Sequence, residues 1–132
     1  MNEITHIQTE VIGKHVLANF HGVDPVILND PEILLHWMVE SIKFSGATYV
    51  GELVKQFKCR ETGKPLGVTI LILLAESHIS CHSYPEHGYA MLDYFTCGDH
   101  CDPEQGMKHL SDLMKPKHTI IQVIDRERLI NF

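Results

Sequence analysis

The chain has 132 residues, of which 44% are hydrophobic, and 17 acidic residues against 11 Lys and Arg give it a formal net charge of −6. This length predicts one domain, residues 1–132, and the acidic balance argues against nucleic-acid binding, which normally needs a basic face. No apolar run approaches the ~20 residues that span a bilayer, and the N-terminus lacks the regions of a signal peptide. We therefore expect a cytoplasmic protein that does not bind membranes, with its four cysteines as thiols.

The first half of the chain predicts a strand, a helix and a second strand. Residues 1–12 read as a lead-in or an edge segment, and residues 15–20 alternate as a strand does. Asp30 can cap a helix that starts at Pro31, and apolar residues then recur at helical spacing until Gly46. A strand over residues 49–58 follows and ends in a polar loop that contains glycine.

The second half predicts three more strands and a second helix. Residues 68–82 are expected to form one strand, whose first part is too apolar to be exposed on either face. A strand over residues 89–96, a helix capped by Asp102 and a strand over residues 118–125 complete the order. This order predicts an α/β (α+β) two-layer sandwich, in which the helices pack on one face of an antiparallel sheet.

The reactive side chains gather between residues 75 and 98. An apolar run stops at Glu76-Ser77-His78, a turn follows at Pro85-Glu86-His87-Gly88, and a second apolar run ends in Phe95-Thr96-Cys97-Gly98. We therefore expect these groups at the ends of two neighbouring strands. By spacing alone, Ser77 is an ordinary polar strand residue and Cys97 a small buried one.

These motifs, with His82, Asp93, Gly13-Lys14-His15 and Ser45-Gly46-Ala47-Thr48, resemble those of the bacterial and archaeal S-adenosylmethionine decarboxylase proenzymes. The resemblance covers roughly residues 13–123. It implies a pyruvoyl-dependent decarboxylase of polyamine synthesis, which cleaves itself at Glu76-Ser77. It also implies a homodimer of αβ units with its sites near the subunit interface.

The resemblance assigns a role to each reactive residue. Ser77 matches the self-cleaving serine, which would leave a β chain of residues 1–76 and an α chain of residues 77–132, the latter headed by a pyruvoyl group. A serine hydroxyl needs a base, and His82 matches the proton acceptor of processing, since neutral imidazole is available at physiological pH. Cys97 matches the proton donor of decarboxylation, a role that suits a thiol because it is mostly protonated at neutral pH.

Two departures from the family pattern concern the substrate and processing. Thr69 stands where a serine assists processing, and Gly63 stands where an aromatic ring stacks on adenine. Phe57 or Tyr84 can supply that ring, whereas Glu86 or Glu61 could hold a cationic tail. The first expectation is S-adenosylmethionine as substrate; the alternative is an L-arginine or L-ornithine decarboxylase of the same family.

Two other classes of protein compete with this reading. A zinc site could use His78, His82, Cys97, His100 and Cys101, but the C-x₂-C pairs typical of structural zinc sites are absent, and we expect no functional metal. A non-enzymatic small-molecule-binding domain has only its compact α/β shape in its favour. Cys81 and Cys101 match no family position and are expected to serve packing.

Overall fold

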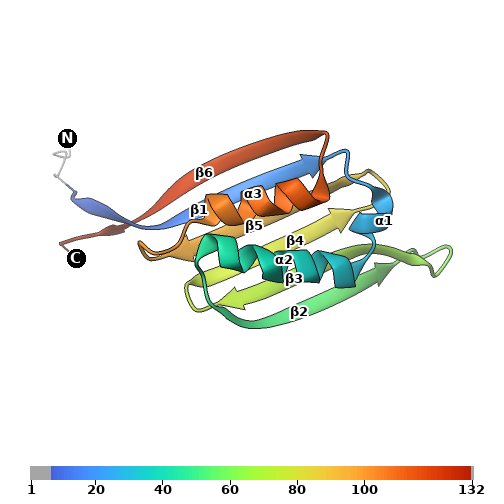
Figure 1. Cartoon of the computed structure of the whole chain (residues 1–132), viewed down its shortest axis with the longest axis horizontal. Coiled ribbons are helices and arrows are strands. Elements are labelled where there is room, and N and C mark those ends of the chain that lie inside the picture. The colour runs from blue at the N-terminus through green and yellow to red at the C-terminus, as the bar shows by residue number, and fades with distance from the viewer. Residues whose placement is uncertain (1–6, 132) are drawn as a thin grey trace, which may run out of the picture.

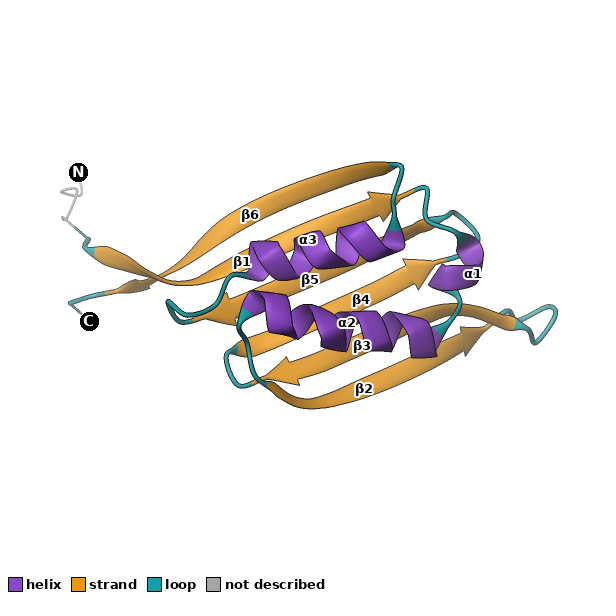
Figure 2. Cartoon of the chain, viewed as in Figure 1, coloured by secondary structure: helices purple, strands orange, loops and turns teal. Residues whose placement is uncertain are grey.

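The computed structural model describes residues 7–131 and shows a six-stranded antiparallel sheet with its helices on one face (Figures 1 and 2). The strand order is β2-β3-β4-β5-β1-β6, which confirms the predicted sandwich. Among the residues described, no helix is long and apolar enough to cross a membrane. The elements are β1 (Thr9–His21), α1 (Pro25–Leu28), α2 (Pro31–Ser45), β2 (Tyr49–Lys58), β3 (Pro65–Leu74), β4 (Ser77–Tyr84), β5 (Tyr89–Cys97), α3 (Pro103–Met114) and β6 (His118–Leu129).

Both long helices begin where the sequence predicts. The carboxylate of Asp30 accepts hydrogen bonds from the second and third backbone N–H groups of α2, and Asp102 does the same for α3. Helix α2 ends at Gly46, as expected. The single-turn helix α1 begins at Pro25, and the side chain of the preceding Asp24 accepts a hydrogen bond from the Val26 N–H.

Alternate strand residues form a core beneath the two helices. Ile70 and Ile72 of β3 and Leu92 of β5 pack with Met38 of α2 and Leu110 of α3, all fully or almost fully buried. Burial of each such side chain contributes about 1.5–3 kcal/mol. No helix of residues 7–131 lies on the opposite face of the sheet (Figure 1), and we call this the open face. Its exposed or half-exposed side chains include His15, Leu53, Leu71, Leu73, His78, Ser80, His82, Met91 and Asp93.

The predicted strands differ from the observed ones in two respects. Residues 68–82 form two strands, because the chain reverses between β3 and β4 through only Ala75 and Glu76. Backbone bonds hold this reversal: Ala75 N–H donates to the Thr48 carbonyl at 2.9 Å. The second difference concerns β1 and its neighbour β6, an edge strand of the sheet. Both extend beyond their predicted ends, because the pairing of the two strands continues to Thr9 and Leu129.

Candidate active site

Ser77 is the first residue of β4 and has a strained backbone. Its φ angle is 152°, a value that L-residues other than glycine rarely adopt, at a cost on the order of 1–3 kcal/mol. The Ser77 hydroxyl lies 2.9 Å from Nδ1 of His78, a residue of the open face. The strain is therefore at the residue that follows the expected cleavage bond.

Both the backbone and the side chain of Glu76 are held in place. Its carbonyl oxygen, the atom next to the expected cleavage bond, accepts a hydrogen bond from the Cys97 N–H at 2.9 Å. Its carboxylate accepts bonds from Thr48 N (2.8 Å) and Thr48 Oγ1 (3.1 Å) and pairs with His100 Nε2 at 3.0 Å. The His100 bond, followed by the Thr48 bonds, lowers the pKa of Glu76 to about 2. The carboxylate is thus ionised at neutral pH.

Cys97 ends β5 beside the expected cleavage bond. Its backbone bond to Glu76 fixes its position, and its Cα partner in β1 is Gly13. A Cβ atom at residue 13 would lie 3.2 Å from Cys97 Sγ and 2.9 Å from a ring carbon of Phe95. The glycine therefore leaves room for the thiol, and the structure brings Glu76, Ser77 and Cys97 together.

His82 and Thr69 form a second group of side chains on the open face. They are partners across β3 and β4, with Thr69 Oγ1 2.5 Å from His82 Nδ1. The rings of Phe57 and Tyr84 lie edge-on to the imidazole of His82, with centroids 5.9 and 4.6 Å away. Gly63 lies in the β2–β3 turn, where nothing lies within 4 Å of its Cβ direction. Phe57, not residue 63, therefore brings an aromatic ring to this group.

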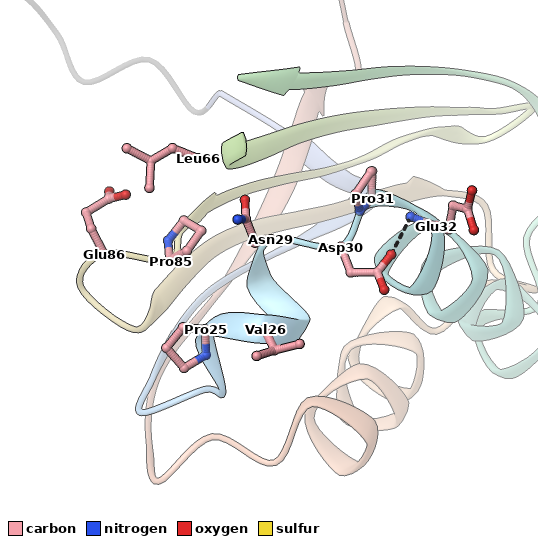
Figure 3. Close-up of a pocket in the computed structure, with 9 residues that line it drawn as sticks. All are labelled: Pro25, Val26, Asn29, Asp30, Pro31, Glu32, Leu66, Pro85 and Glu86. Atoms are coloured by element: carbon pink, nitrogen blue, oxygen red, sulfur yellow. Dashed lines mark hydrogen bonds between the residues drawn. The ribbon is translucent and has the colours of Figure 1, made fainter. Parts of the chain in front are cut away.

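The two groups are well separated within one chain. Ser77 and His82 stand five residues apart on one strand, which at about 3.3 Å per residue is about 16 Å. Glu86 is farther still, in the turn after β4. It lines a separate pocket with Pro25, Asn29 and Leu66 (Figure 3), so the structure does not bring Glu86 to Ser77.

The sequence reasoning missed several partners in this region. His78, considered only as a metal ligand, lies within hydrogen-bond distance of the Ser77 hydroxyl, at 2.9 Å. Asp93 accepts a hydrogen bond from Ser80 at 3.0 Å and pairs with His15 at 2.9 Å. The alternation of His78, Ser80 and His82 along one strand was a local signal for a polar face. Thr48 and His100 had no local signal, because each lies more than twenty residues from Glu76.

The two cysteines without family counterparts differ in their surroundings. Cys81 is buried in the core, as expected, and burial raises its pKa to about 12. Cys101 is only partly buried and lies close to Glu76, and its pKa is raised by burial and by that carboxylate.

Comparison with known proteins gives a consistent result. The family model described as S-adenosylmethionine decarboxylase matches residues 14–127. An S-adenosylmethionine decarboxylase proenzyme of Brevibacillus brevis is 38% identical over 120 residues, which cover 91% of this chain and 86% of the relative. A proenzyme of the same name from Pyrobaculum aerophilum is 35% identical over 116 residues, 88% of this chain and 89% of the relative.

A solved structure agrees with these matches. The crystal structure of the adenosylmethionine decarboxylase from Aquifex aeolicus superimposes with a TM-score of 0.81 at 31% sequence identity, covering 93% of this chain and 97% of that chain. The matched residues include the whole segment that holds Glu76, Ser77, His82 and Cys97. The chain therefore belongs to the S-adenosylmethionine decarboxylase family.

Proposed function

We propose that this protein is a self-processing, pyruvoyl-dependent S-adenosylmethionine decarboxylase that cleaves its own backbone between Glu76 and Ser77. One observation carries the proposal: the strained φ of Ser77 coincides with a Glu76 carbonyl polarised by the Cys97 N–H. A donor at this oxygen stabilises the negative charge that develops when a nucleophile attacks the carbonyl.

The cleavage chemistry follows from these atoms. Ser77 Oγ attacks the Glu76 carbonyl carbon, and the C–N bond breaks to give an ester and a free amine on residue 77. Elimination then releases the Glu76 α-carboxylate, and hydrolysis of the remaining dehydroalanine releases ammonia and leaves a pyruvoyl group. This group supplies an electron sink for loss of CO₂ from an amino acid. Cys97, beside residue 77, would return a proton to the product, as the family resemblance implies.

The processing base is proposed to come from a second copy of the chain. Within one copy the Thr69–His82 pair is about 16 Å from Ser77 along β4. Two copies could pack with their open faces together, related by a two-fold axis that runs between the two sheets and passes over β4 near Ser80. The β4 strands of the two copies would then run in opposite directions, with His82 of one copy opposite Ser77 of the other. Such a dimer forms two sites, each with residues from both copies.

The open face has the surface that such a dimer needs. Leu53, Leu71, Leu73 and Met91 expose 74%, 44%, 57% and 42% of their surface and stand on adjacent or nearby strands. Exposed apolar groups in one contiguous patch commonly mark a protein interface. Sheets packed face to face lie about 10 Å apart, close enough for side chains of both copies to meet.

The substrate proposal rests on the relatives and on the rings near His82. Both curated relatives named above carry S-adenosylmethionine in their names, and so favour it over arginine or ornithine. Phe57 and Tyr84 offer faces on which adenine could stack. We also propose a cytoplasmic location in polyamine synthesis, because the four cysteines are free thiols and suit a reducing compartment.

Intact-mass analysis tests the processing step. The purified chain should appear as two fragments, residues 1–76 and residues 77–132, the second carrying a carbonyl in place of its N-terminal amine. Ser77→Ala should remain one chain. A wild-type chain that stays at full length after prolonged incubation would overturn the proposal.

Side-by-side assays test the substrate and the cofactor. CO₂ release should be clear from S-adenosylmethionine and slight from arginine and ornithine. Activity should survive exhaustive chelation and should be lost on treatment with borohydride in the presence of substrate. Preference for a basic amino acid would refute the substrate assignment alone, and loss of activity on chelation would refute the pyruvoyl assignment.

A further inference from the structure

Beside the cleavage bond, a cluster of three different metal-ligating side chains remains outside the chemistry described above. The carboxylate of Glu76, the imidazole of His100 and the thiol of Cys101 offer ligand atoms that all lie within 4.8 Å of one another. A carboxylate, an imidazole and a thiolate together are a typical ligand set for Zn²⁺. We propose that these residues bind Zn²⁺ or a similar borderline-soft divalent cation.

The backbone and neighbouring groups already orient the ligands. Thr48 N–H and Oγ1 donate to the Glu76 carboxylate at 2.8 and 3.1 Å, as supporting groups do around metal ligands. His100 Nε2 is already 3.0 Å from that carboxylate. The segment that carries the thiol is tied to the end of α2, because Asp102 N–H donates to the Ser45 carbonyl at 2.8 Å.

The geometry indicates an open, three-ligand site. Zn–N and Zn–O bonds of about 2.0 Å and a Zn–S bond of about 2.3 Å would hold the three ligand atoms closer together than 4.8 Å, and the His100 side chain, which is 62% exposed, has room to adjust its position. A fourth position would be taken by water, as in zinc sites that are not closed by protein. We therefore expect weaker binding than in a closed four-ligand site.

The position of this cluster matters because of the bond beside it. Glu76 is the last residue of the proposed N-terminal fragment, whereas His100 and Cys101 belong to the C-terminal fragment. A bound cation would thus join the two fragments across the cleavage bond. It is not required for decarboxylation, and chelation would remove it without loss of activity.

Co²⁺ titration of the Ser77→Ala chain tests the site without depending on self-cleavage. Co²⁺ bound to a thiolate gives a near-ultraviolet charge-transfer band, and Zn²⁺ should abolish that band by displacing Co²⁺. Cys101→Ser should remove the band, His100→Gln should weaken binding at least tenfold, and the matched control Cys97→Ser should keep both band and affinity. All variants should first show the same thermal unfolding without metal.

The outcomes separate this inference from the proposed function. Absence of the band in Ser77→Ala, or its loss in Cys97→Ser with retention in Cys101→Ser, would overturn the site. Neither result bears on cleavage, which is measured by mass on the wild-type chain. Conversely, a wild-type chain that never cleaves could still show the band and its dependence on Cys101.

Discussion

The proposal that His82 acts on Ser77 of another copy makes a quantitative prediction about mixed dimers. Ser77→Ala removes the nucleophile and His82→Ala removes the base, so each variant alone should remain uncleaved. If both are produced together, a mixed dimer has one site in which Ser77 of the His82→Ala chain faces an intact His82. Its other site lacks both groups.

The expected yield follows from pairing statistics. With equal amounts and random pairing, about half of all His82→Ala chains have a Ser77→Ala partner, so about half of them, and about one quarter of all chains, should be cleaved. The physical basis is the separation of about 16 Å between Ser77 and His82 on one strand, too far for proton transfer through one hydrogen bond or one bridging water.

Intact mass measures this directly, because the fragments of the His82→Ala chain differ in mass from both full-length chains. Mixing the two purified variants after folding is a control and should give cleavage only as fast as the dimers exchange. No cleavage after co-production would refute the shared site. Complete cleavage of His82→Ala alone would show that His82 is dispensable, and would make His78, 2.9 Å from the Ser77 hydroxyl, the better base.

Three further predictions concern binding, packing and pH. Phe57→Ala should raise KM for S-adenosylmethionine about fivefold with little change in kcat, since one stacking contact contributes about 1 kcal/mol. Phe44→Ala, which removes a ring on the helical face, is the control. An equal rise in KM in both variants would contradict the stacking role of Phe57. Gly106→Ala should lower stability by about 1–2 kcal/mol in thermal or urea unfolding, because its Cβ would lie 2.5 Å from the buried Tyr94 ring; an unchanged Tm would show that α3 shifts freely. Glu76 has a folded pKa of about 2 against an ordinary 4.5, so its ionised carboxylate stabilises the fold above pH 4.5, and this stabilisation is lost as pH falls toward 2. In the Ser77→Ala chain, Glu76→Gln should therefore make the free energy of unfolding fall less steeply over that pH range. A pH dependence of stability identical to that of Ser77→Ala alone would contradict this role of Glu76.

Local signals predicted the elements whose ends depend on nearby residues. Asp30-Pro31 and Asp102-Pro103 fix the helix starts through bonds to backbone groups two and three residues away, and such short-range chemistry is readable from sequence. The strand Tyr49–Lys58 was predicted at its true bounds for a similar reason, because polar loop residues follow it directly.

The features that escaped prediction depend on partners distant in sequence. The reversal at Ala75-Glu76 contains no Gly, Pro, Asn or Asp, the residues that normally mark a turn, and it is held by Thr48 and His100 from two other loops. The extended ends of β1 and β6 depend on the pairing of Thr9 with Leu129. The roles proposed for Ser77, His82 and Cys97 come from the family resemblance, because spacing alone made Ser77 an ordinary polar strand residue and Cys97 a small buried one.

The strand order has a consequence for how a cleaved molecule would fold. Cutting at Glu76-Ser77 would leave β1, β2 and β3 in one fragment and β4, β5 and β6 in the other, yet β1 lies between β5 and β6. Three of the five strand pairings, β3 with β4, β5 with β1 and β1 with β6, would then join different fragments. The fragments are interleaved, so they cannot separate without loss of the sheet and its core. Refolding of the cut molecule would be a second-order reaction, and the midpoint of its unfolding transition would depend on protein concentration. In an uncut chain, by contrast, the six strands of the sheet are covalently linked.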